Sequence, residues 1–214
     1  APMLDHLVCD RESEDLVAAA SGYQFDAVLD IIAKTPEHAR QAIKLAERCR
    51  RLIMVSTDYV YDPAHRSLLL KETEARYSEI DDYGGGKRRA EMEIIQAQEA
   101  GHVDSTILRP PHIYGPGSNP GTIPNHGRRP TLLDDIEAGM TLRLLQGGLG
   151  LIQPIHVEDL GRIVVEMIEN PSSYGEAVTC AGPEVMTNLD YYKMLAACID
   201  VDLKTMVYEP TEVD

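Results

Sequence analysis

The sequence predicts an α/β protein with a doubly wound parallel sheet, because short apolar runs alternate along the chain with longer segments of helical periodicity. The run Leu52-Ile53-Met54-Val55 ends directly in hydroxyl-bearing residues, as a buried parallel strand does when it delivers side chains to the carboxyl edge of its sheet. The 214 residues, 43% of them hydrophobic, are consistent with one globular unit. With one Phe and no Trp, the core must be largely aliphatic.

The first half of the chain contains most of the expected sheet. Thr35 followed by Pro36 marks a helix start, since Thr caps a first turn and Pro suits its first position. The elements give three strands in right-handed βαβ succession. They are predicted as a strand at 25–32, a helix at 36–50, a strand at 51–56, a helix at 83–100 and a strand at 104–109.

Beyond Pro110 the composition changes to a stretch rich in Gly, Pro and Asn at 115–130. Loops longer than about 15 residues are uncommon unless they are functional or mobile, so this stretch is expected to begin a substrate-binding region, with a plain surface loop as the alternative. We divide the chain into a core at 1–110 and a mixed region at 111–214, which adds the last core elements and a small substrate-binding part. The later elements are predicted as a helix at 131–138, short strands near 141–145, a helix at 157–169, a strand at 174–180 and a helix at 188–199.

The candidate chemistry lies in Thr57, Tyr83 and Lys87. A phenol has a pKa near ~10, and a neighbouring ammonium lowers it, which makes the phenol useful for proton transfer near neutral pH. The i, i+4 spacing places Tyr83 and Lys87 on one face of the helix predicted at 83–100. A Thr hydroxyl donates and accepts, so Thr57 can hold a substrate oxygen. A Tyr and a Lys four residues apart also occur as an exposed helix pair, but the preceding buried strand favours a proton-transfer site.

Four segments occur in a characteristic order: S-T-D-Y-V-Y-D at 56–62, D-Y-G-G-G-K-R-R-A-E at 82–91, L-R-P-P-H-I-Y-G-P-G at 108–117 and P-I-H-V-E-D-L at 154–160. Together they resemble segments of the extended short-chain dehydrogenase/reductase family, which includes nucleotide-sugar epimerases, dehydratases and 4-keto-sugar reductases. The resemblance covers nearly the whole chain and implies a Rossmann-like fold.

The resemblance also implies roles for particular residues. Tyr83 would be the acid/base, Lys87 would lower its pKa and bind the nicotinamide ribose, and Thr57 would hydrogen-bond the reacting oxygen. The cofactor would be NAD or NADP, and no metal is expected. Cofactor contacts would come from Asp10, Ala33, Tyr83, Lys87, Pro110 and His112, and substrate contacts from Thr57, Asp58, Tyr59 and His112.

The resembled enzymes begin with a strand, a G-x-x-G-x-x-G turn and a helix that hold the cofactor pyrophosphate, and the sequence contains no such turn. Residues 7–11 instead resemble a later segment in which an Asp contacts adenine, hence the assignment of Asp10. We expect the chain to be part of a longer enzyme; a short homologue that has lost dinucleotide binding is the alternative. The choice between NAD and NADP depends on the same absent segment and is not readable.

The substrate stays open between a nucleotide sugar and a related hydroxy or keto compound. Many relatives carry an Arg three positions before the I-H-V motif, where its fork can pair with a diphosphate, but this chain has Ile152. Gln153 and the segment Val28-Leu29-Asp30 resemble an atypical branch of the family instead. Compensating cations could come from Arg128, Arg129 and Arg143, which are otherwise expected on the surface.

Two further features have structural alternatives. Gly84, Gly85 and Gly86 each cost about 1 kcal/mol of helix stability relative to Ala, which close approach by a ligand would offset; a loosened first turn is the alternative. His156 is expected to be structural, because it precedes a helix whose first turn contains Asp159.

Composition narrows the partners. The net charge of −15 disfavours contact with nucleic-acid backbones, and the cluster Arg48, Arg50, Arg51 is predicted as the solvated end of a helix. The four cysteines lack metal-site spacing and are predicted to be reduced and mostly buried. With no membrane-length apolar stretch and no signal-like N-terminus, the chain is predicted to be cytoplasmic and without a membrane partner.

Three functions compete. The first is an NAD(P)-dependent epimerase, dehydratase or ketoreductase acting on a small molecule, favoured by the Thr57, Tyr83, Lys87 set. The second is a non-catalytic dinucleotide-fold sensor or scaffold protein that has lost cofactor binding. The third is an RNA-associated protein, since part of the atypical branch is linked to RNA, but the net charge opposes it. A homodimer through the helix with Tyr83 and the helix at 36–50 is common in the family, although apolar residues there also suit an intramolecular core.

Overall fold

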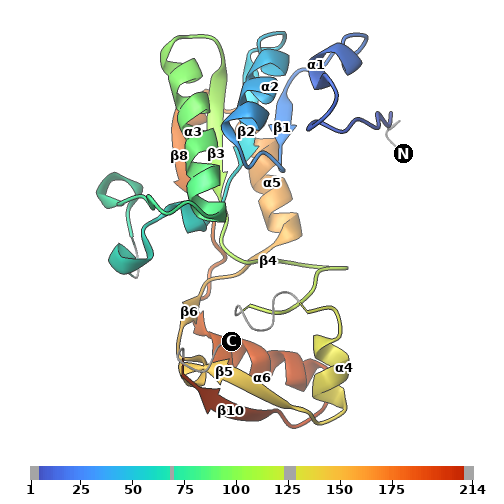
Figure 1. The fold of residues 1–214 in the computed structure, drawn as a ribbon, viewed down its shortest axis with the longest axis vertical. Coiled ribbons are helices and arrows are strands. Elements are labelled where there is room, and N and C mark those ends of the chain that lie inside the picture. The colour runs from blue at the N-terminus through green and yellow to red at the C-terminus, as the bar shows by residue number, and fades with distance from the viewer. Residues whose placement is uncertain (1–4, 68–69, 123–128, 210–214) are drawn as a thin grey trace. The chain divides into compact units, whose positions relative to one another are not determined.

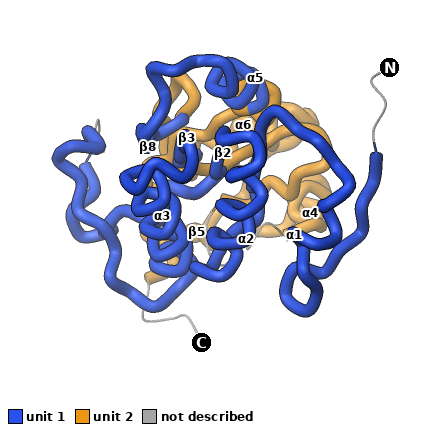
Figure 2. Tube along the Cα trace, turned by 90° about the horizontal axis from the view of Figure 1, so that it is seen from above, with its two compact units in different colours: residues 1–110, 161–180 blue, residues 111–160, 181–214 orange. Residues whose placement is uncertain are grey.

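The structure, a computed structural model, describes residues 5–67, 70–122 and 129–209. The chain divides into two compact units (Figure 2). Unit 1 comprises residues 1–110 and 161–180, and unit 2 comprises residues 111–160 and 181–214. None of the described helices combines the length and apolar character needed to cross a membrane. Within the loop predicted at 115–130, residues 123–128, including Arg128, lie outside the described residues.

Unit 1 is built on a parallel sheet with the strand order β1-β2-β3-β8. All four strands fall inside the predicted ranges, although β1 is shorter than the strand predicted at 25–32. The predicted α/β fold with a parallel sheet is therefore confirmed. The strands are β1 (Val28–Asp30), β2 (Arg51–Val55), β3 (Asp104–Arg109) and β8 (Glu176–Thr179).

Helices cover both faces of this sheet. The strands lie between α2 (Pro36–Ala46) and α3 (Tyr83–Glu99) on one side and the unit 1 part of α5 (Val157–Ile168) on the other (Figures 1 and 2). A short helix, α1 (Leu16–Ala19), precedes β1. The core under α2 and α3 is aliphatic and rich in alanine, as the scarcity of aromatic residues predicts. It includes Ala39, Ala42, Ile43, Ala46, Leu52, Met54, Ala90, Ile94, Ala97 and Ile107.

The predicted start of α2 is confirmed in detail. The Thr35 hydroxyl accepts a hydrogen bond from the backbone N–H of His38 at 3.3 Å, and Pro36 occupies the first helical position. The helix ends at Ala46, four residues before the predicted end at 50.

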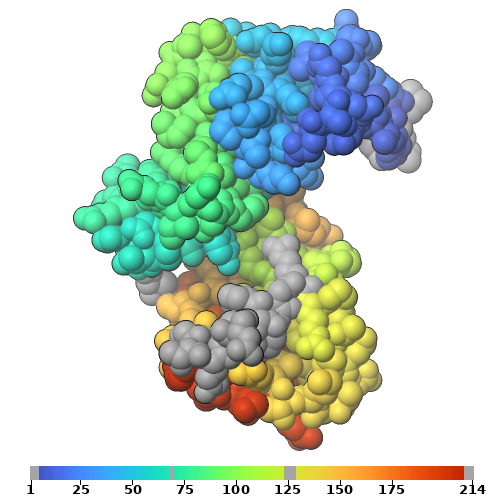
Figure 3. Space-filling model, viewed as in Figure 1, coloured from blue at the N-terminus to red at the C-terminus, as the bar shows by residue number. Residues whose placement is uncertain are grey.

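Between β2 and α3 the chain makes an excursion that protrudes from unit 1 (Figures 1 and 3). The Tyr61 hydroxyl lies 2.8 Å from the Thr179 hydroxyl, and the Thr179 N–H donates to the Glu72 carboxylate at 2.8 Å. Two points of the excursion are thus fastened to the end of β8. Its 3₁₀ turns are η1 (Asp58–Val60), η2 (Pro63–His65) and η3 (Glu72–Glu74).

Unit 2 combines two complete helices and the first residues of α5 with short strand pairs in its described residues. The helices are α4 (Leu132–Glu137) and α6 (Asn188–Cys198). Strand β5 (Thr141–Leu145) pairs in parallel with β10 (Lys204–Tyr208), β4 (Ile113–Tyr114) in parallel with β7 (Ile155–His156), and β6 (Leu151–Ile152) antiparallel with β9 (Met186–Thr187). Its core contains Leu132, Ile136, Leu142, Leu144, Tyr191, Tyr192 and Ala196. Further 3₁₀ turns are η5 (Gln146–Gly148) in unit 2 and η6 (Pro171–Ser173) in unit 1.

The prediction of a solvated arginine cluster is wrong for Arg51, because β2 begins at this residue and buries it. Its guanidinium donates to the Asp104 carbonyl and the Thr106 hydroxyl, both at 2.8 Å, and lies 4.6 Å from the Tyr174 ring centroid. Burial lowers the pKa of the Arg51 guanidinium. Its N–H groups are satisfied by carbonyl and hydroxyl oxygens.

The prediction of mostly buried cysteines is also wrong. Cys180 is buried, Cys9 and Cys49 are half-buried, and Cys198 is exposed. Burial raises the pKa of the Cys180 thiol to about 11.

Candidate active site

The first part of the candidate site lies where β2 and β3 end. The Ser56 N–H donates to the Leu108 carbonyl at 2.7 Å, which continues the pairing of the two strands past Val55. The buried Thr57 then starts η1, and its hydroxyl accepts from the Tyr59 N–H at 3.3 Å. The Asp58 N–H donates to the Pro110 carbonyl at 3.1 Å. Thr57 therefore lies at the carboxyl edge of the sheet, as predicted from the strand pattern, and Asp58 and Pro110 lie beside it there.

The start of α3 packs directly on backbone at this edge. Asp82 caps the helix by accepting from the Gly85 N–H at 2.9 Å. A Cβ at Gly84 would lie 2.2 Å from the Tyr59 carbonyl oxygen, and one at Gly85 would lie 1.9 Å from the Ile80 carbonyl oxygen. The glycines are explained by close approach of the protein's own backbone, not by the ligand approach or loosened turn considered from the sequence.

Tyr83 and Lys87 occupy different environments on α3. Tyr83 is 57% exposed, and its ring makes an edge contact with Tyr59, with 6.5 Å between centroids. Lys87 is only 3% exposed, and its ammonium donates to the Val55 carbonyl at 2.9 Å. Burial lowers the pKa of the Lys87 ammonium, and Arg11 adds to this effect, while Asp30 and Glu91 oppose it. Lys87 is thus fixed at the end of β2, two residues from Thr57.

Asp30 is a site residue for which sequence analysis proposed no role. It is buried at the end of β1, where its carboxylate accepts from the N–H groups of Ile32 and Ala33 at 3.0 and 2.8 Å. The Arg11 guanidinium binds both of its oxygens, at 3.2 and 3.0 Å. The sequence signal was present: a lone carboxylate interrupts the apolar run 28–32. Ala33, predicted to contact the cofactor, lies beside this carboxylate and is fully buried in the core.

A second pair without a predicted role connects α3 to the end of β3. Glu91 lies eight residues after Tyr83 on α3, and Arg109 precedes Pro110. Both are fully buried, and the Arg109 guanidinium donates hydrogen bonds to both Glu91 carboxylate oxygens, at 3.0 and 2.8 Å. The spacing Tyr83, Lys87, Glu91 on one helix face is the signal that could have indicated it.

Asp58 and Tyr59, both predicted to contact substrate, lie beside Arg66. The Arg66 guanidinium forms an ion pair with the Asp58 carboxylate at 3.3 Å and lies 5.5 Å from the Tyr59 ring centroid. Burial raises the pKa of the Asp58 carboxyl, against the opposing charge of Arg66. Tyr59 is 61% exposed and so presents its ring to the surroundings.

Several polar atoms at this edge keep capacity for a ligand. The Ser56 hydroxyl and one Asp58 carboxylate oxygen are buried without a hydrogen-bond partner among the described residues. The Lys87 ammonium carries three N–H donors, and the bond to Val55 accounts for one of them. Such groups fit the ribose and carboxamide end of a dinucleotide. The sequence contains no glycine-rich turn for its pyrophosphate end.

Two predicted contact residues are not joined to this group. Asp10 is exposed, and its carboxylate accepts from the Glu12 N–H at 3.0 Å and the Ser13 hydroxyl at 2.8 Å, bonds that lower its pKa. His112 belongs to unit 2, where its carbonyl accepts from the Ile155 N–H at 2.9 Å and its ring makes an edge contact with Tyr191.

Two other residues singled out in the sequence have structural contacts in unit 2. His156 accepts from the Glu158 N–H at 3.3 Å at the start of α5, and Asp159 lies in the first turn of that helix. Gln153, which follows Ile152, donates to the Gly182 carbonyl at 2.7 Å.

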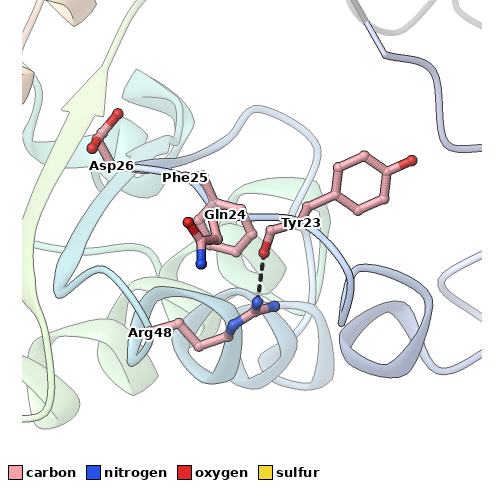
Figure 4. Close-up of a pocket in the computed structure, with 5 residues that line it drawn as sticks. All are labelled: Tyr23, Gln24, Phe25, Asp26 and Arg48. Atoms are coloured by element: carbon pink, nitrogen blue, oxygen red, sulfur yellow. Dashed lines mark hydrogen bonds between the residues drawn. The ribbon is translucent and has the colours of Figure 1, made fainter.

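A pocket elsewhere in unit 1 is separate from these groups. Its lining residues precede β1 or follow α2, which places it at the amino edge of the sheet. Figure 4 shows Arg48 reaching the Tyr23 carbonyl, and the guanidinium lies 5.1 Å from the Phe25 ring centroid. Arg48 lines this pocket and is held by backbone carbonyls, and none of Thr57, Tyr83 and Lys87 is among the lining residues. Its lining consists of Tyr23, Gln24, Phe25, Asp26 and Arg48.

The fold and the edge residues together define an α/β protein of the dinucleotide-binding type, with Thr, Tyr and Lys at the carboxyl ends of parallel strands. The model of the NAD dependent epimerase/dehydratase family matches residues 15–181. The chain therefore belongs to the NAD-dependent epimerase/dehydratase family, as its sequence motifs predicted.

Among curated proteins, the chain is similar to the chloroplast stem-loop binding protein of 41 kDa b from Arabidopsis thaliana, with 26% identity over 184 residues. The match covers 85% of this chain and 45% of that protein, so the chain spans less than half the length of this relative.

Solved structures of the same fold include two sugar-nucleotide epimerases. UDP-glucuronic acid 4-epimerase from Bacillus cereus, in complex with NAD, is 19% identical with a TM-score of 0.75, over 94% of this chain and 68% of that one. UDP-N-acetylglucosamine 4-epimerase from Methanobrevibacter ruminantium, in complex with UDP-N-acetylmuramic acid, is 18% identical with a TM-score of 0.74, over 95% of this chain and 70% of that one. At this identity the likeness establishes the fold.

Proposed function

We propose that the protein is an NAD(P)-dependent enzyme of the epimerase, dehydratase or ketoreductase type, with Tyr83 as its acid/base. The observation that carries the proposal is the placement of Lys87, a buried cation one helical turn from Tyr83 and bonded to the strand end that precedes Thr57. A cation there favours the phenolate and leaves N–H groups for ribose hydroxyls. Membership of an NAD-dependent family supports the cofactor class.

Each residue of the edge has a proposed task. Thr57 holds the substrate oxygen, and Tyr83 moves the proton at its phenolic oxygen. Asp58, Tyr59 and His112 contact substrate. When bound, the dinucleotide supplies hydride transfer. Its remaining contacts in this proposal come from Asp10, Ala33, Pro110 and His112.

The proposed substrate is a nucleotide sugar or a related hydroxy or keto compound. The two similar structures described above are nucleotide-sugar epimerases, which supports the class. Ile152 stands where many relatives have a diphosphate-binding Arg, which leaves the related compounds open.

The first test replaces the phenol. Tyr83→Phe is expected to lower turnover about a thousandfold while cofactor affinity stays within a factor of two, because general acid–base catalysis contributes on that order. Lys87→Met is expected to lower both turnover and cofactor affinity. The assay follows conversion of UDP-glucuronic acid, UDP-N-acetylglucosamine and dTDP-glucose with NAD or NADP, using the protein isolated from its source and the 214-residue chain.

Tyr23→Phe is the matched control, since Tyr23 lines the pocket at the other edge of the sheet, and it should keep full activity. Full activity in Tyr83→Phe would contradict the acid/base role. Absence of both cofactor binding and turnover, in the protein from its source as well as in the 214-residue chain, would favour the non-catalytic sensor or scaffold instead.

RNA binding is a second candidate, favoured by one observation: the similar Arabidopsis protein is named for stem-loop binding. The net charge of −15 opposes it. A gel shift with stem-loop RNA at low salt distinguishes the two. A shifted band that weakens as salt rises would favour RNA association, and no band at low salt would dismiss it.

A further inference from the structure

Glu91 and Arg109 form a buried ion pair whose side-chain nitrogens and oxygens all have hydrogen-bond partners. The Arg109 guanidinium binds both Glu91 oxygens, and its remaining nitrogen donates to the hydroxyls of Tyr61 at 3.2 Å and Tyr77 at 3.3 Å. Arg88 adds a third cation–carboxylate contact to Glu91 at 2.9 Å, and its guanidinium lies 3.6 Å from the Tyr77 ring centroid. Each polar atom of the pair is therefore satisfied by a group with a fixed direction.

Such a pair is poorly explained by stability alone. Removing two charges from water is costly, and apolar residues of similar volume often serve a core equally well. A two-pronged guanidinium–carboxylate contact does supply direction, because it fixes both separation and angle between the elements that carry it.

The two elements joined by the pair carry the two halves of the candidate site. Glu91 lies on α3, one turn beyond Lys87 and two beyond Tyr83. Arg109 ends β3, and the next residue, Pro110, accepts the Asp58 N–H beside Thr57. At its start α3 is seated on the carbonyls of Tyr59 and Ile80 through Gly84 and Gly85. The Glu91–Arg109 pair adds a buried, directional contact near the middle of the helix.

We propose that Glu91 and Arg109 are positioning residues that set the rotation and depth of α3, and with them the placement of Tyr83 and Lys87 against Thr57. This inference rests on the proposed function of Tyr83 and deepens it. Neither residue touches the reacting atoms; they act through the helix.

The test keeps a positive charge at position 109 and removes the two-pronged guanidinium. Arg109→Lys retains a cation but not the two-pronged geometry. We expect the Tyr83 Cζ resonance, measured by NMR with ¹³C-labelled tyrosine and assigned with Tyr83→Phe, to shift. We also expect the pKa of Tyr83 to rise as Lys87 is displaced, because a more distant cation favours the phenolate less.

The chain offers a matched control on the same helix. Arg40 binds both oxygens of Glu93 on α3, at 3.0 and 2.8 Å, but this pair is exposed. Arg40→Lys should leave the Tyr83 resonance and the pKa of Tyr83 at their parent values.

A double variant separates position from stability. Glu91→Leu combined with Arg109→Met removes both buried charges together. Its unfolding midpoint should therefore lie closer to that of the parent than the midpoint of Arg109→Lys does. The Tyr83 resonance should nevertheless stay displaced, as in Arg109→Lys. If both variants leave the resonance and the pKa of Tyr83 at the parent values, the pair is purely structural and the proposal is overturned.

Failure of the proposed function has a different signature. If Lys87→Met leaves the pKa of Tyr83 unchanged, Lys87 does not tune the phenol and the acid/base assignment fails. The Tyr83 resonance in Arg109→Lys still decides the positioning role, because it reports ring placement without reference to catalysis.

Discussion

The two units use buried polar groups very differently. Among the described residues, buried polar and charged side chains lie in unit 1, with Asn188 in unit 2 as the exception. Unit 1 buries Asp30, Arg51, Lys87, Glu91 and Arg109. The core of unit 2 is formed by leucine, isoleucine, tyrosine and alanine side chains.

This contrast indicates which unit requires side chains to be held at fixed distances and angles. Apolar packing is tolerant of small rearrangements, whereas a hydrogen-bonded charge holds its partner at one distance and angle. Unit 1 contains Thr57, Tyr83 and Lys87, whose proposed chemistry requires fixed geometry. Unit 2 contains the region proposed to contact substrate, for which an apolar core is sufficient support.

The largest expected effect tests whether unit 1 depends on buried charge. Arg51→Met should destabilise the protein by about 3–5 kcal/mol, because it removes the donors that satisfy several buried oxygens, including the Asp104 carbonyl. Asn188→Ala in unit 2 should cost only about 1–2 kcal/mol. Urea unfolding followed by tyrosine fluorescence measures both.

Arg50→Met is the control for the first variant, since its side chain is exposed and pairs with Asp104 only at 3.7 Å. It should change stability by less than about 0.5 kcal/mol. Equal costs for Arg51→Met and Asn188→Ala would remove the contrast between the units.

An intermediate effect concerns alkaline pH and the cysteines. The pKa of Cys180 in unit 1 is raised to about 11 from 9.0, so its contribution to stability is complete below pH 9 and is lost as pH rises through about 11. The loss should amount to about 2–3 kcal/mol. Comparing Cys180→Ala with the parent across this range isolates it.

The exposed Cys198 in unit 2 supplies the reference. Cys198→Ala should leave the loss of unfolding free energy between pH 9 and 11 unchanged. If the same loss persists in Cys180→Ala, other groups are responsible for it.

The smallest expected effects test whether both units contain a glycine whose Cα packs directly against a backbone carbonyl. A Cβ at Gly85 in unit 1 or Gly182 in unit 2 would lie 1.9 or 2.1 Å from a carbonyl oxygen, so Ala at either site should destabilise by about 1–3 kcal/mol. Gly161→Ala on α5 meets no atom within 4 Å and should stabilise by up to about 1 kcal/mol. Thermal unfolding of the three variants checks the signs; stabilisation in Gly85→Ala would contradict the close approach described above.

Much of unit 1 was predictable because its signals are local. The apolar run 52–55, the Thr35–Pro36 cap and the spacing of Tyr83 and Lys87 each depend on neighbouring residues, and each predicted element occurs in the structure.

What the sequence did not reveal depends on contacts between distant segments. The burial of Arg51 comes from residues 104–106 and 167–174, and the roles of Asp30 and Glu91 come from Arg11 and Arg109. No local pattern distinguishes the buried charge of Arg51 from a solvated one. For Asp30 and Glu91 the local signals described above indicate burial, but they do not identify the partners Arg11 and Arg109. Likewise, β10 pairs with β5 across some sixty positions, and its alternation alone is weak.

The seating of α3 on the Tyr59 and Ile80 carbonyls has a consequence for how such a protein can evolve. Every amino-acid replacement of Gly84 or Gly85 adds a Cβ, so no single substitution there is neutral by default. The depth at which α3 begins is therefore held constant by the absence of two side chains, and any change at these two positions must be accompanied by a shift of the Tyr59 or Ile80 backbone.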